Sequence, residues 1–361
     1  MSKKLGVGII GCGGIANAKH MPNLLKIDNV EVIGVCDLFQ PERAVELIRK
    51  FGLKSCSVYE NYYELLKNTE IESIHVCTPN ESHAPITIDA LNAGKNVMCE
   101  KPMAMNVEQA QTMADTAKRT GKKLTICANN RFRPDSWYLK EICTQGMLGH
   151  IYYAKAHAIR RRGVPTWGNF MNIESQGGGP MIDIGTHALD LALWMMDNYE
   201  PQMVLGKTYN YLGKTTSPAN PYGNWDAEKY TVEDSGFGMI IMKNGTTINL
   251  ESSWALNIID EKTAKVTLCG IKAGADMDNG LTINGEMNGR LYEQKIILEP
   301  QKIPFYGTQE IFGPELEIRL WVDALLNDKE PVVKPEQMVV VAKIIQALYE
   351  SDISNKPIYF E

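Results

Sequence analysis

Three side chains are the strongest candidates for proton transfer: Lys101, Asp183 and His187. Asp183 and His187 stand four residues apart after the run Gly177-Gly-Gly-Pro180, so on a helix they would share one face. A carboxylate beside an imidazole makes a general base whose tautomer and charge are controlled. The competing interpretation is structural: an acid at the start of a helix, followed by a histidine that packs in the core, would give the same spacing. One turn further on, Asp190 is better suited to a supporting role.

Lys101 lies in the short motif Cys99-Glu100-Lys101-Pro102, directly after an apolar run. At the end of a parallel strand, a lysine amine points into the crevice where ligands bind. Pro102 restricts the backbone at this point. A surface lysine that merely follows a strand is the competing interpretation.

A glycine cluster near the start of the chain indicates the cofactor class. Apolar residues 5–10 lead into Gly11-Cys-Gly13-Gly-Ile-Ala16, the phosphate-binding turn of a dinucleotide fold. Gly11 permits the tight turn, and Gly13 lets the backbone approach a pyrophosphate. Asp37 ends a second apolar run about 20 residues later, where a carboxylate binds ribose hydroxyls. Asp37 predicts NAD rather than NADP, because its carboxylate repels a 2′-phosphate. Arg43 is near in sequence, and an arginine is the residue type that binds such a phosphate, so NADP remains the alternative.

Two halves with different patterns must position these residues. We expect strands at 5–10, 30–36, 72–77, 95–99 and 123–127, alternating with helices, and hence a doubly wound parallel α/β sheet. Alternating strands follow at 151–159, 236–243, 246–254, 264–269 and 291–298, with the hairpin signal Asn244-Gly245, and predict an antiparallel sheet built from hairpins. Two helices end the chain, one around residues 318–325 and one from Pro335. We expect a nucleotide-binding domain at 1–127 and a second domain at 128–361, with the terminal helices free to pack back on the first.

Composition excludes several function classes. The 361 residues carry 37 basic and 43 acidic side chains, a net charge of −6 that gives no reason to expect nucleic acid. No run approaches the roughly 20 apolar residues of a membrane span. Eight cysteines without a Cys-x-x-Cys pair indicate buried thiols rather than disulfides or a metal site. Residues 3–16 resemble a short signal peptide, but the phosphate turn explains them better, and we expect a cytoplasmic protein without bound metal.

Together these motifs carry a family resemblance. The glycine turn, Thr78-Pro79-Asn80 with His83, Glu100-Lys101-Pro102, Asn130-Arg131 and the segment from Gly178 to His187 resemble the Gfo/Idh/MocA family in order and approximate spacing. The later Val232-Glu233-Asp234 and Tyr349-Glu-Ser351 also resemble it. The resemblance covers nearly the whole chain.

The resemblance implies an N-terminal Rossmann domain and an α+β C-terminal domain with an open, mainly antiparallel sheet that joins subunits into dimers or tetramers. It implies that Lys101, Asp183 and His187 form the catalytic trio, and that the Lys101–Pro102 bond is cis. We expect the cofactor to be bound by the residues that follow the strand ends: Gly11, Gly13, Gly14, Ile15, Asp37, Thr78, Pro79, Asn80, His83, Glu100, Lys101 and Arg131.

The substrate is the least determined part. In the family, the region after the first strand of the second domain reaches over the substrate, which here places Arg160, Arg162 and Trp167 beside Lys101, Asp183 and His187. Aromatic and polar groups together favour a polyol, and we expect oxidation of a ring hydroxyl of a sugar, cyclitol or glycoside, for example at C3. Two alternatives remain open: cleavage of a glycosidic bond with NAD recycled in place, and a non-catalytic NAD-sensing regulator.

Overall fold

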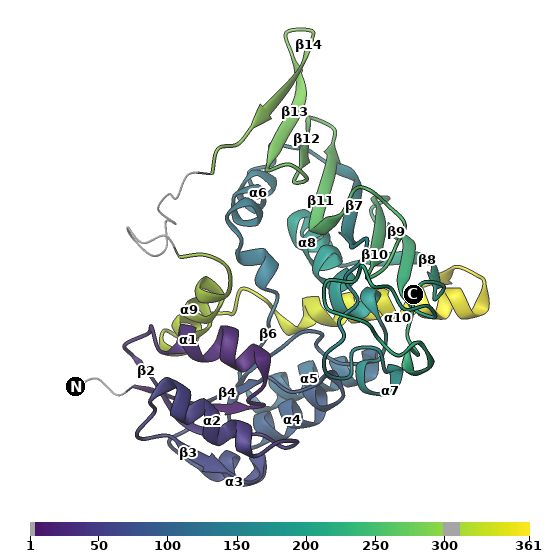
Figure 1. Ribbon diagram of the computed structural model, residues 1–361. Coiled ribbons are helices and arrows are strands. Elements are labelled where there is room, and N and C mark those ends of the chain that lie inside the picture. The colour runs from purple at the N-terminus through teal and green to yellow at the C-terminus, as the bar shows by residue number, and fades with distance from the viewer. Residues whose placement is uncertain (1–3, 299–310) are drawn as a thin grey trace. The chain divides into compact units, whose positions relative to one another are not determined.

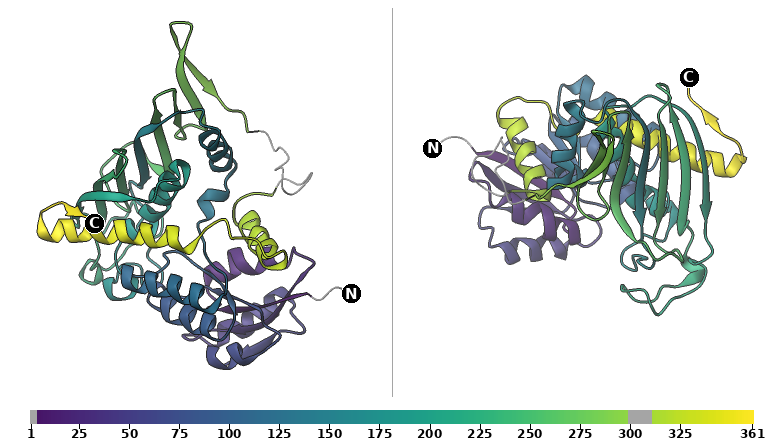
Figure 2. Two further views of the ribbon diagram at one scale, coloured as in Figure 1. Left: turned by 180° about the vertical axis from the view of Figure 1, so that it is seen from behind. Right: turned by 90° about the horizontal axis from the view of Figure 1, so that it is seen from above.

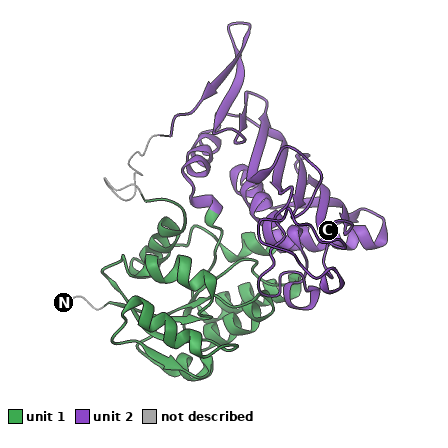
Figure 3. Ribbon diagram, viewed as in Figure 1, with its two compact units in different colours: residues 1–129, 311–339 green, residues 130–310, 340–361 purple. Residues whose placement is uncertain are grey.

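The computed structural model describes residues 4–298 and 311–361, which form two compact units (Figure 3). Unit 1 comprises residues 1–129 and 311–339, and unit 2 comprises residues 130–310 and 340–361. Each unit is described by itself below. The domain boundary that we place after residue 127 remains a prediction.

Unit 1 contains a six-stranded parallel sheet in the order β3-β2-β1-β4-β5-β6 (Figure 1). Its strands are β1 (Leu5–Ile10), β2 (Val30–Cys36), β3 (Ser57–Tyr59), β4 (Ser73–Val76), β5 (Asn96–Cys99) and β6 (Leu124–Ile126). The strand order reverses between β1 and β4, and this switch point is where doubly wound sheets bind ligands. Five of the six strands confirm the predicted ones. Only the short and largely exposed β3 has no counterpart among them.

Helices connect these strands, and local signals set their ends. Asn61 and Asn106 cap the first turns of two of them by accepting bonds from Glu64 and Gln109 amides, while Gly52 ends another in the left-handed conformation. The helices of unit 1 are the π-helix η1 (Ala16–His20), α1 (Met21–Leu24), α2 (Glu42–Phe51), α3 (Tyr62–Lys67), α4 (Asn80–Asn92), α5 (Val107–Thr120) and α9 (Gly313–Leu326).

Although α9 is distant in sequence, it belongs to the core of unit 1. Ile318, Trp321 and Val322 of α9 pack in one buried cluster with apolar residues of β1 and β2. The indole N–H of Trp321 donates to the hydroxyl of Ser73 at the start of β4 (3.2 Å). A segment that is distant in sequence therefore completes the core of unit 1.

Unit 2 is built on a nine-stranded sheet in the order β14-β13-β12-β11-β7-β10-β9-β8-β15 (Figures 1 and 2). Its strands are β7 (Ile151–Ile159), β8 (Pro201–Tyr209), β9 (Ser235–Met242), β10 (Thr247–Ser253), β11 (Lys262–Gly270), β12 (Ala273–Asp276), β13 (Thr282–Met287), β14 (Arg290–Lys295) and β15 (Ile358–Tyr359). The predicted hairpin at Asn244-Gly245 joins β9 to β10. One pairing corrects the expectation of hairpins alone: β7 and β10 run parallel. Nearly ninety residues separate these two strands in sequence, so no tight turn fixes their direction.

One face of this sheet is covered by helices. Along β8, β9 and β7, the covered face carries small side chains such as Gly206, Gly238 and Ala156, which lets Leu348 and α8 approach closely. On the other face, Leu205 and Met239 are exposed. The helices of unit 2 are η2 (Asn129–Phe132), α6 (Pro134–Thr144), α7 (Ile173–Gln176), the π-helix η3 (Met181–Gly185), α8 (Thr186–Met196), η4 (Ala227–Lys229) and α10 (Pro335–Ser354). The first residue of η2 and the first five residues of α10 belong to unit 1.

Candidate active site

The glycine turn after β1 has the shape that a bound phosphate requires. Gly11 has φ +92°, and a Cβ on it would lie 2.6 Å from the backbone of Cys77, so only glycine fits. Around Gly13 the nearest atom to an added Cβ would be a guanidinium nitrogen of Arg43 at 4.0 Å, and around Gly14 there is open space. The backbone is thus open to a ligand where the turn enters η1.

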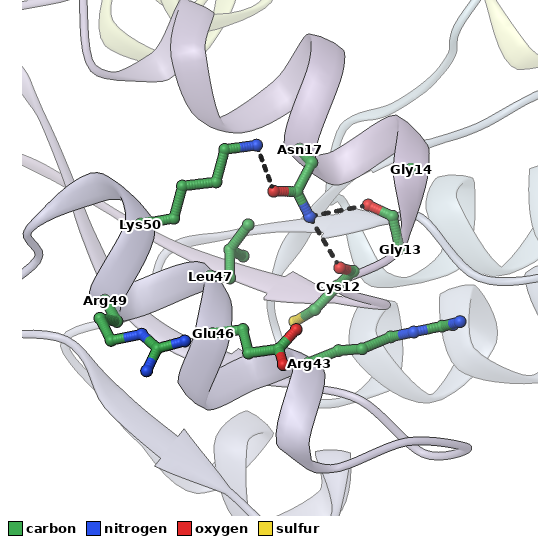
Figure 4. Close-up of a pocket in the computed structure, with 9 residues that line it drawn as sticks. All are labelled: Cys12, Gly13, Gly14, Asn17, Arg43, Glu46, Leu47, Arg49 and Lys50. Atoms are coloured by element: carbon green, nitrogen blue, oxygen red, sulfur yellow. Dashed lines mark hydrogen bonds between the residues drawn. The ribbon is translucent and has the colours of Figure 1, made fainter.

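A cavity of about 630 Å³ adjoins this turn, between η1 and α2 (Figure 4). In Figure 4, Asn17 faces Lys50, whose ammonium donates to the Asn17 side-chain oxygen (2.9 Å). Asn17 in turn donates to the carbonyls of Cys12 and Gly13. Arg43, Glu46 and Arg49 also line the cavity, so that with Lys50 its wall carries three basic groups and one acid beside the glycine turn.

Asp37 closes the turn from the end of β2. One carboxylate oxygen accepts from the Cys12 amide (2.8 Å), and the other accepts from the amides of Phe39 and Gln40 (3.1 and 2.9 Å). The side chain is buried, and these bonds fix the path of the glycine turn relative to β2. The contact of Asp37 with ribose hydroxyls remains a prediction.

The segments after β4 and β5 are joined by His83. Its Nδ1 lies 2.7 Å from the carbonyl oxygen of Pro102, and its Nε2 lies 2.8 Å from that of Thr78. Burial lowers the pKa of His83, and a neutral ring donates to one carbonyl at a time. The Lys101–Pro102 bond is cis, as expected. The hydroxyl of Thr78 is buried without a hydrogen-bond partner among the described residues, which suits a site that a ligand completes.

A buried charge network lies behind Lys101. Glu100 accepts from the Lys19 ammonium (2.8 Å), and the same oxygen lies 2.9 Å from Nε2 of His20. The Lys19 ammonium also lies 2.9 Å from the carboxylate of Glu317 on α9. The backbone amide of Lys101 donates to the second oxygen of Glu100 (3.2 Å). Glu100 thereby links the candidate catalytic lysine to η1 and, through Lys19, to α9.

The ionisation of this network follows from its burial and pairing. Burial alone would raise the pKa of Glu100, but Lys19 and His20 hold it well below its usual value. Burial opposes the charge of Lys19, yet the acidic groups around it hold its pKa well above the usual value. Burial lowers the pKa of His20 and, further, of His75. The neutral His20 ring then donates to Glu100 and accepts from Nδ1 of His75 (2.8 Å).

Within the described residues, His20, Glu100 and Cys127 form one group of potential metal ligands. The Glu100 oxygen is already bonded to an ammonium and an imidazole. A metal ion there would have to displace Lys19, so we assign no metal to this cluster.

In unit 2, Asp183 and His187 lie on the continuous segment η3–α8. Asp183 is in the π-helical turn and His187 in the first turn of α8, in agreement with the predicted helix. The buried Asp183 carboxylate accepts from the indole N–H of Trp254 (3.0 Å) at the end of β10. This bond fixes one oxygen of the candidate catalytic acid.

Glu233 anchors the start of η3. Its two carboxylate oxygens accept from the amides of Gly179 (2.8 Å) and Met181 (3.0 Å), and the hydroxyl of Tyr349 also donates to it (2.8 Å). A Cβ on Gly179 would lie 2.2 Å from the Glu233 carbonyl oxygen, which explains the glycine at this position. The carboxylate thus binds the first amide of η3 and one amide that precedes it, as at a capped helix start.

The remaining predicted residues have partners inside unit 2. Arg131 is fully buried and donates to Asp190 at 2.9 and 2.5 Å, which agrees with a supporting role for Asp190. A cofactor contact of Arg131 remains a prediction. Arg160 donates to the Gly163 carbonyl (3.1 Å), and Arg162 donates to the Asn257 side chain (2.8 Å). Trp167 is exposed.

Several of these contacts were not predicted from the sequence. Trp254 ends a predicted strand, but no local signal points an indole at Asp183. Glu233 and Tyr349 belong to segments that resemble the family, although their shared contact with the glycine run emerges only in three dimensions. Lys19 and His20 follow the glycine turn without a motif of their own.

Comparisons with known proteins agree with this arrangement. Residues 5–127 match the model of an oxidoreductase family with an NAD-binding Rossmann fold, and residues 140–360 match its C-terminal alpha/beta domain. The chain is 41% identical to D-glucoside 3-dehydrogenase of Escherichia coli K12 over 97% of this chain and 96% of that protein. It is 35% identical to glucose-6-phosphate 3-dehydrogenase of Bacillus subtilis 168 over 97% of both chains.

A solved structure extends the agreement to the fold. Levoglucosan dehydrogenase in complex with NADH and levoglucosan superposes with a TM-score of 0.83 at 20% identity, over 99% of both chains. No helix within residues 4–298 and 311–361 is long and apolar enough to cross a membrane. The open glycine turn, the adjoining cavity with its basic side chains, and the Thr78 hydroxyl, which has no partner in the described part of the chain, fit a dinucleotide. This chain is therefore a member of the Gfo/Idh/MocA family of oxidoreductases, with an NAD-binding Rossmann domain.

Proposed function

We propose that this protein is an NAD-dependent dehydrogenase that oxidises a secondary ring hydroxyl of a sugar, cyclitol or glycoside, with C3 of a glucoside as the specific reaction. The observation that carries the proposal is the pair Asp183 and His187 on η3–α8, with Asp183 held by Trp254. The 41% identity with a D-glucoside 3-dehydrogenase over nearly the whole chain supports the substrate class.

In this proposal, Lys101, Asp183 and His187 act on one hydroxyl group. Bound NAD would supply the acceptor for the hydride of the carbinol carbon. His187 removes the hydroxyl proton, and Asp183 orients the imidazole. Lys101 donates a hydrogen bond to the same oxygen and stabilises the negative charge that develops there. Each of these contributions is worth on the order of 100-fold or more in rate. Lys101 and His187 can also be assigned in the reverse order.

The cofactor-binding assignments are proposals of the same kind. Gly11, Gly13, Gly14 and Ile15 would hold the pyrophosphate, and Asp37 the adenosine ribose. The segments that follow β4 and β5, Thr78 to Asn80 and Glu100 to Lys101, would border the nicotinamide half, with His83 holding them together. Arg160, Arg162 and Trp167 would bind substrate.

A screen of glycosides, free sugars and inositols with NAD, followed by the absorbance of NADH, tests this function. We expect NADH to form in a stoichiometric amount with a glucoside. Cleavage of the glycosidic bond without accumulated NADH would favour the alternative in which NAD is recycled in place. Cofactor binding without turnover of any polyol would favour a regulator and contradict the proposal.

Two further properties belong to the proposal. We expect a homodimer or homotetramer that pairs through the open face of the nine-stranded sheet, where Leu205 and Met239 lie opposite one another in register and are exposed. Met239→Lys should lower the mass measured by light scattering, whereas Met287→Lys on β13 should not. We also expect a cytoplasmic location, in line with eight free cysteines. The sequence Ile9-Ile10-Gly11-Cys12 resembles a lipoprotein cleavage site, and a lipid attached to Cys12 would contradict this location.

A further inference from the structure

A row of four aromatic side chains leads from the candidate catalytic carboxylate to the protein surface. Trp254 donates its indole N–H to Asp183, and its ring meets Phe170 edge-on with centroids 6.3 Å apart. Phe170 meets Trp167 at 5.9 Å, and Trp167 meets Tyr222 at 4.8 Å, nearly perpendicular. All five residues belong to unit 2, so their arrangement is internal to one body.

The inner two rings of this row are more buried than the outer two. Trp254 is fully buried and Phe170 is half-buried, while Trp167 and Tyr222 are 53% and 46% exposed. The inner rings therefore serve the packing of unit 2. The outer pair presents apolar ring surface to solvent, which is a common property of ligand-binding surfaces.

The two loops that carry the outer pair are fastened to one another. The buried Asn220 side chain accepts from the Val164 amide and donates to the Val164 carbonyl, both at 3.0 Å. The hydroxyl of Thr166 donates to the carbonyl of Tyr222. Trp167 and Tyr222 are thus held as a prearranged pair, so a ligand that binds them loses little energy in ordering the loops.

We propose that Trp167 and Tyr222 form a platform for the aglycone, or for the second sugar ring, of a glycoside whose first ring is oxidised beside Asp183 and His187. This inference rests on the proposed function. Two ring-to-ring steps separate Trp254, which touches Asp183, from Trp167. The row therefore joins the carboxylate to the platform within unit 2, and the platform is the exposed end of that row. Aromatic rings stack well on apolar ring faces.

The polar groups near the platform favour an uncharged ligand there. Arg160 donates to the Gly163 carbonyl, and Arg162 donates to the Leu256 carbonyl and to the Asn257 side chain. Arg160 thus holds its own loop, and Arg162 joins that loop to the segment after β10. Arg161 is exposed, which makes a phosphorylated hexose the necessary competing substrate in the test.

The experiment compares kcat/KM for methyl and 4-nitrophenyl D-glucosides, in both anomeric forms, with that for glucose 6-phosphate. We expect the better nitrophenyl glucoside to exceed the matching methyl glucoside by about tenfold or more, mainly through KM. Trp167→Ala should reduce this preference to less than about threefold, and Trp167→Phe should restore part of it. Tyr63→Ala, which removes an exposed aromatic ring from unit 1, should leave the preference unchanged.

The outcomes separate the platform from the reaction. If both glucosides are oxidised with equal kcat/KM, or if Trp167→Ala lowers both values equally, the platform is wrong while the dehydrogenase proposal stands. A preference for glucose 6-phosphate over both glucosides also contradicts the platform. If no sugar yields NADH with the unaltered protein, the proposed function itself fails and the platform fails with it.

Discussion

At the scale of single residues, the account depends on how Asp183 and Lys101 are held. Asp183 has one oxygen fixed by the indole of Trp254, and the backbone of Lys101 is fixed by Glu100. The sequence was sufficient to select Asp183, His187 and Lys101 as candidates, because their types and spacing suit proton transfer. It could not identify Trp254, since the bond joins residues 71 positions apart through the packing of β10 against η3.

The assigned chemistry predicts that Lys101→Met and His187→Ala each lower kcat by about 100-fold or more, because each removes a group that acts in the transition state. Both variants should still bind NAD, with a dissociation constant that calorimetry can measure. Near-normal turnover in either variant would remove that residue from the mechanism.

The hydrogen bond that Trp254 donates to Asp183 can be tested separately from the packing of its ring. Trp254→Phe deletes the indole N–H that binds the Asp183 carboxylate, and a hydrogen bond to a charged group is worth about 1.5–3 kcal/mol. We therefore expect a loss of about tenfold or more in kcat. Trp225→Phe is the matched control, because that buried indole donates to the Gly213 carbonyl instead. Equal losses in both variants would indicate a general packing effect.

At the scale of elements, strands that are continuously apolar could be predicted from the sequence, whereas strands without a clear hydrophobic pattern could not. The predicted strands match β1, β2, β4, β5 and β6, whose residues are almost all buried. The prediction lacks β3 and β13, which are short and largely exposed, as well as β8, β12 and β15. Their pairing depends on neighbouring strands, and β-propensity depends strongly on that context. The parallel pairing of β7 with β10 likewise has no local signal.

The ion pairs of Lys19 fasten η1 to the end of β5 and to α9. Lys19→Met leaves the buried carboxylates of Glu100 and Glu317 without their ammonium, and breaking a buried pair costs about 3–5 kcal/mol. We expect a clear drop in the melting temperature and a higher KM for NAD. Lys26→Met, which breaks the more exposed pair with Glu315, should cost less than about 1 kcal/mol. Similar stability of both variants would contradict the role of Lys19.

At the scale of the whole molecule, buried histidines should make stability depend on pH. Burial lowers the pKa values of His20, His75 and His83 from the usual 6.5, so the folded chain keeps them neutral. Below about pH 6.5 the unfolded chain binds protons that the folded chain does not. Stability should therefore fall as the pH is lowered from 7.5 to 5.5, by up to about 1.4 kcal/mol per histidine and pH unit.

The melting temperature measured across this pH range tests that expectation. His75→Asn keeps a hydrogen-bond donor near Nδ1 but cannot titrate, so its melting temperature should depend less steeply on pH. The exposed His150→Asn variant should retain the slope of the unaltered protein. A melting temperature that stays constant from pH 7.5 to 5.5 would show that these histidines titrate alike in both states.

The most direct test of the proposed reaction follows the hydrogen that leaves the sugar. A methyl glucoside carrying deuterium at C3 is incubated with the protein and NAD, and the products are analysed by mass spectrometry. We predict one deuterium in the NADH, an intact 3-keto glucoside, and loss of both products in His187→Ala. Unlabelled NADH, or a cleaved glycoside without any NADH, would contradict oxidation at that carbon.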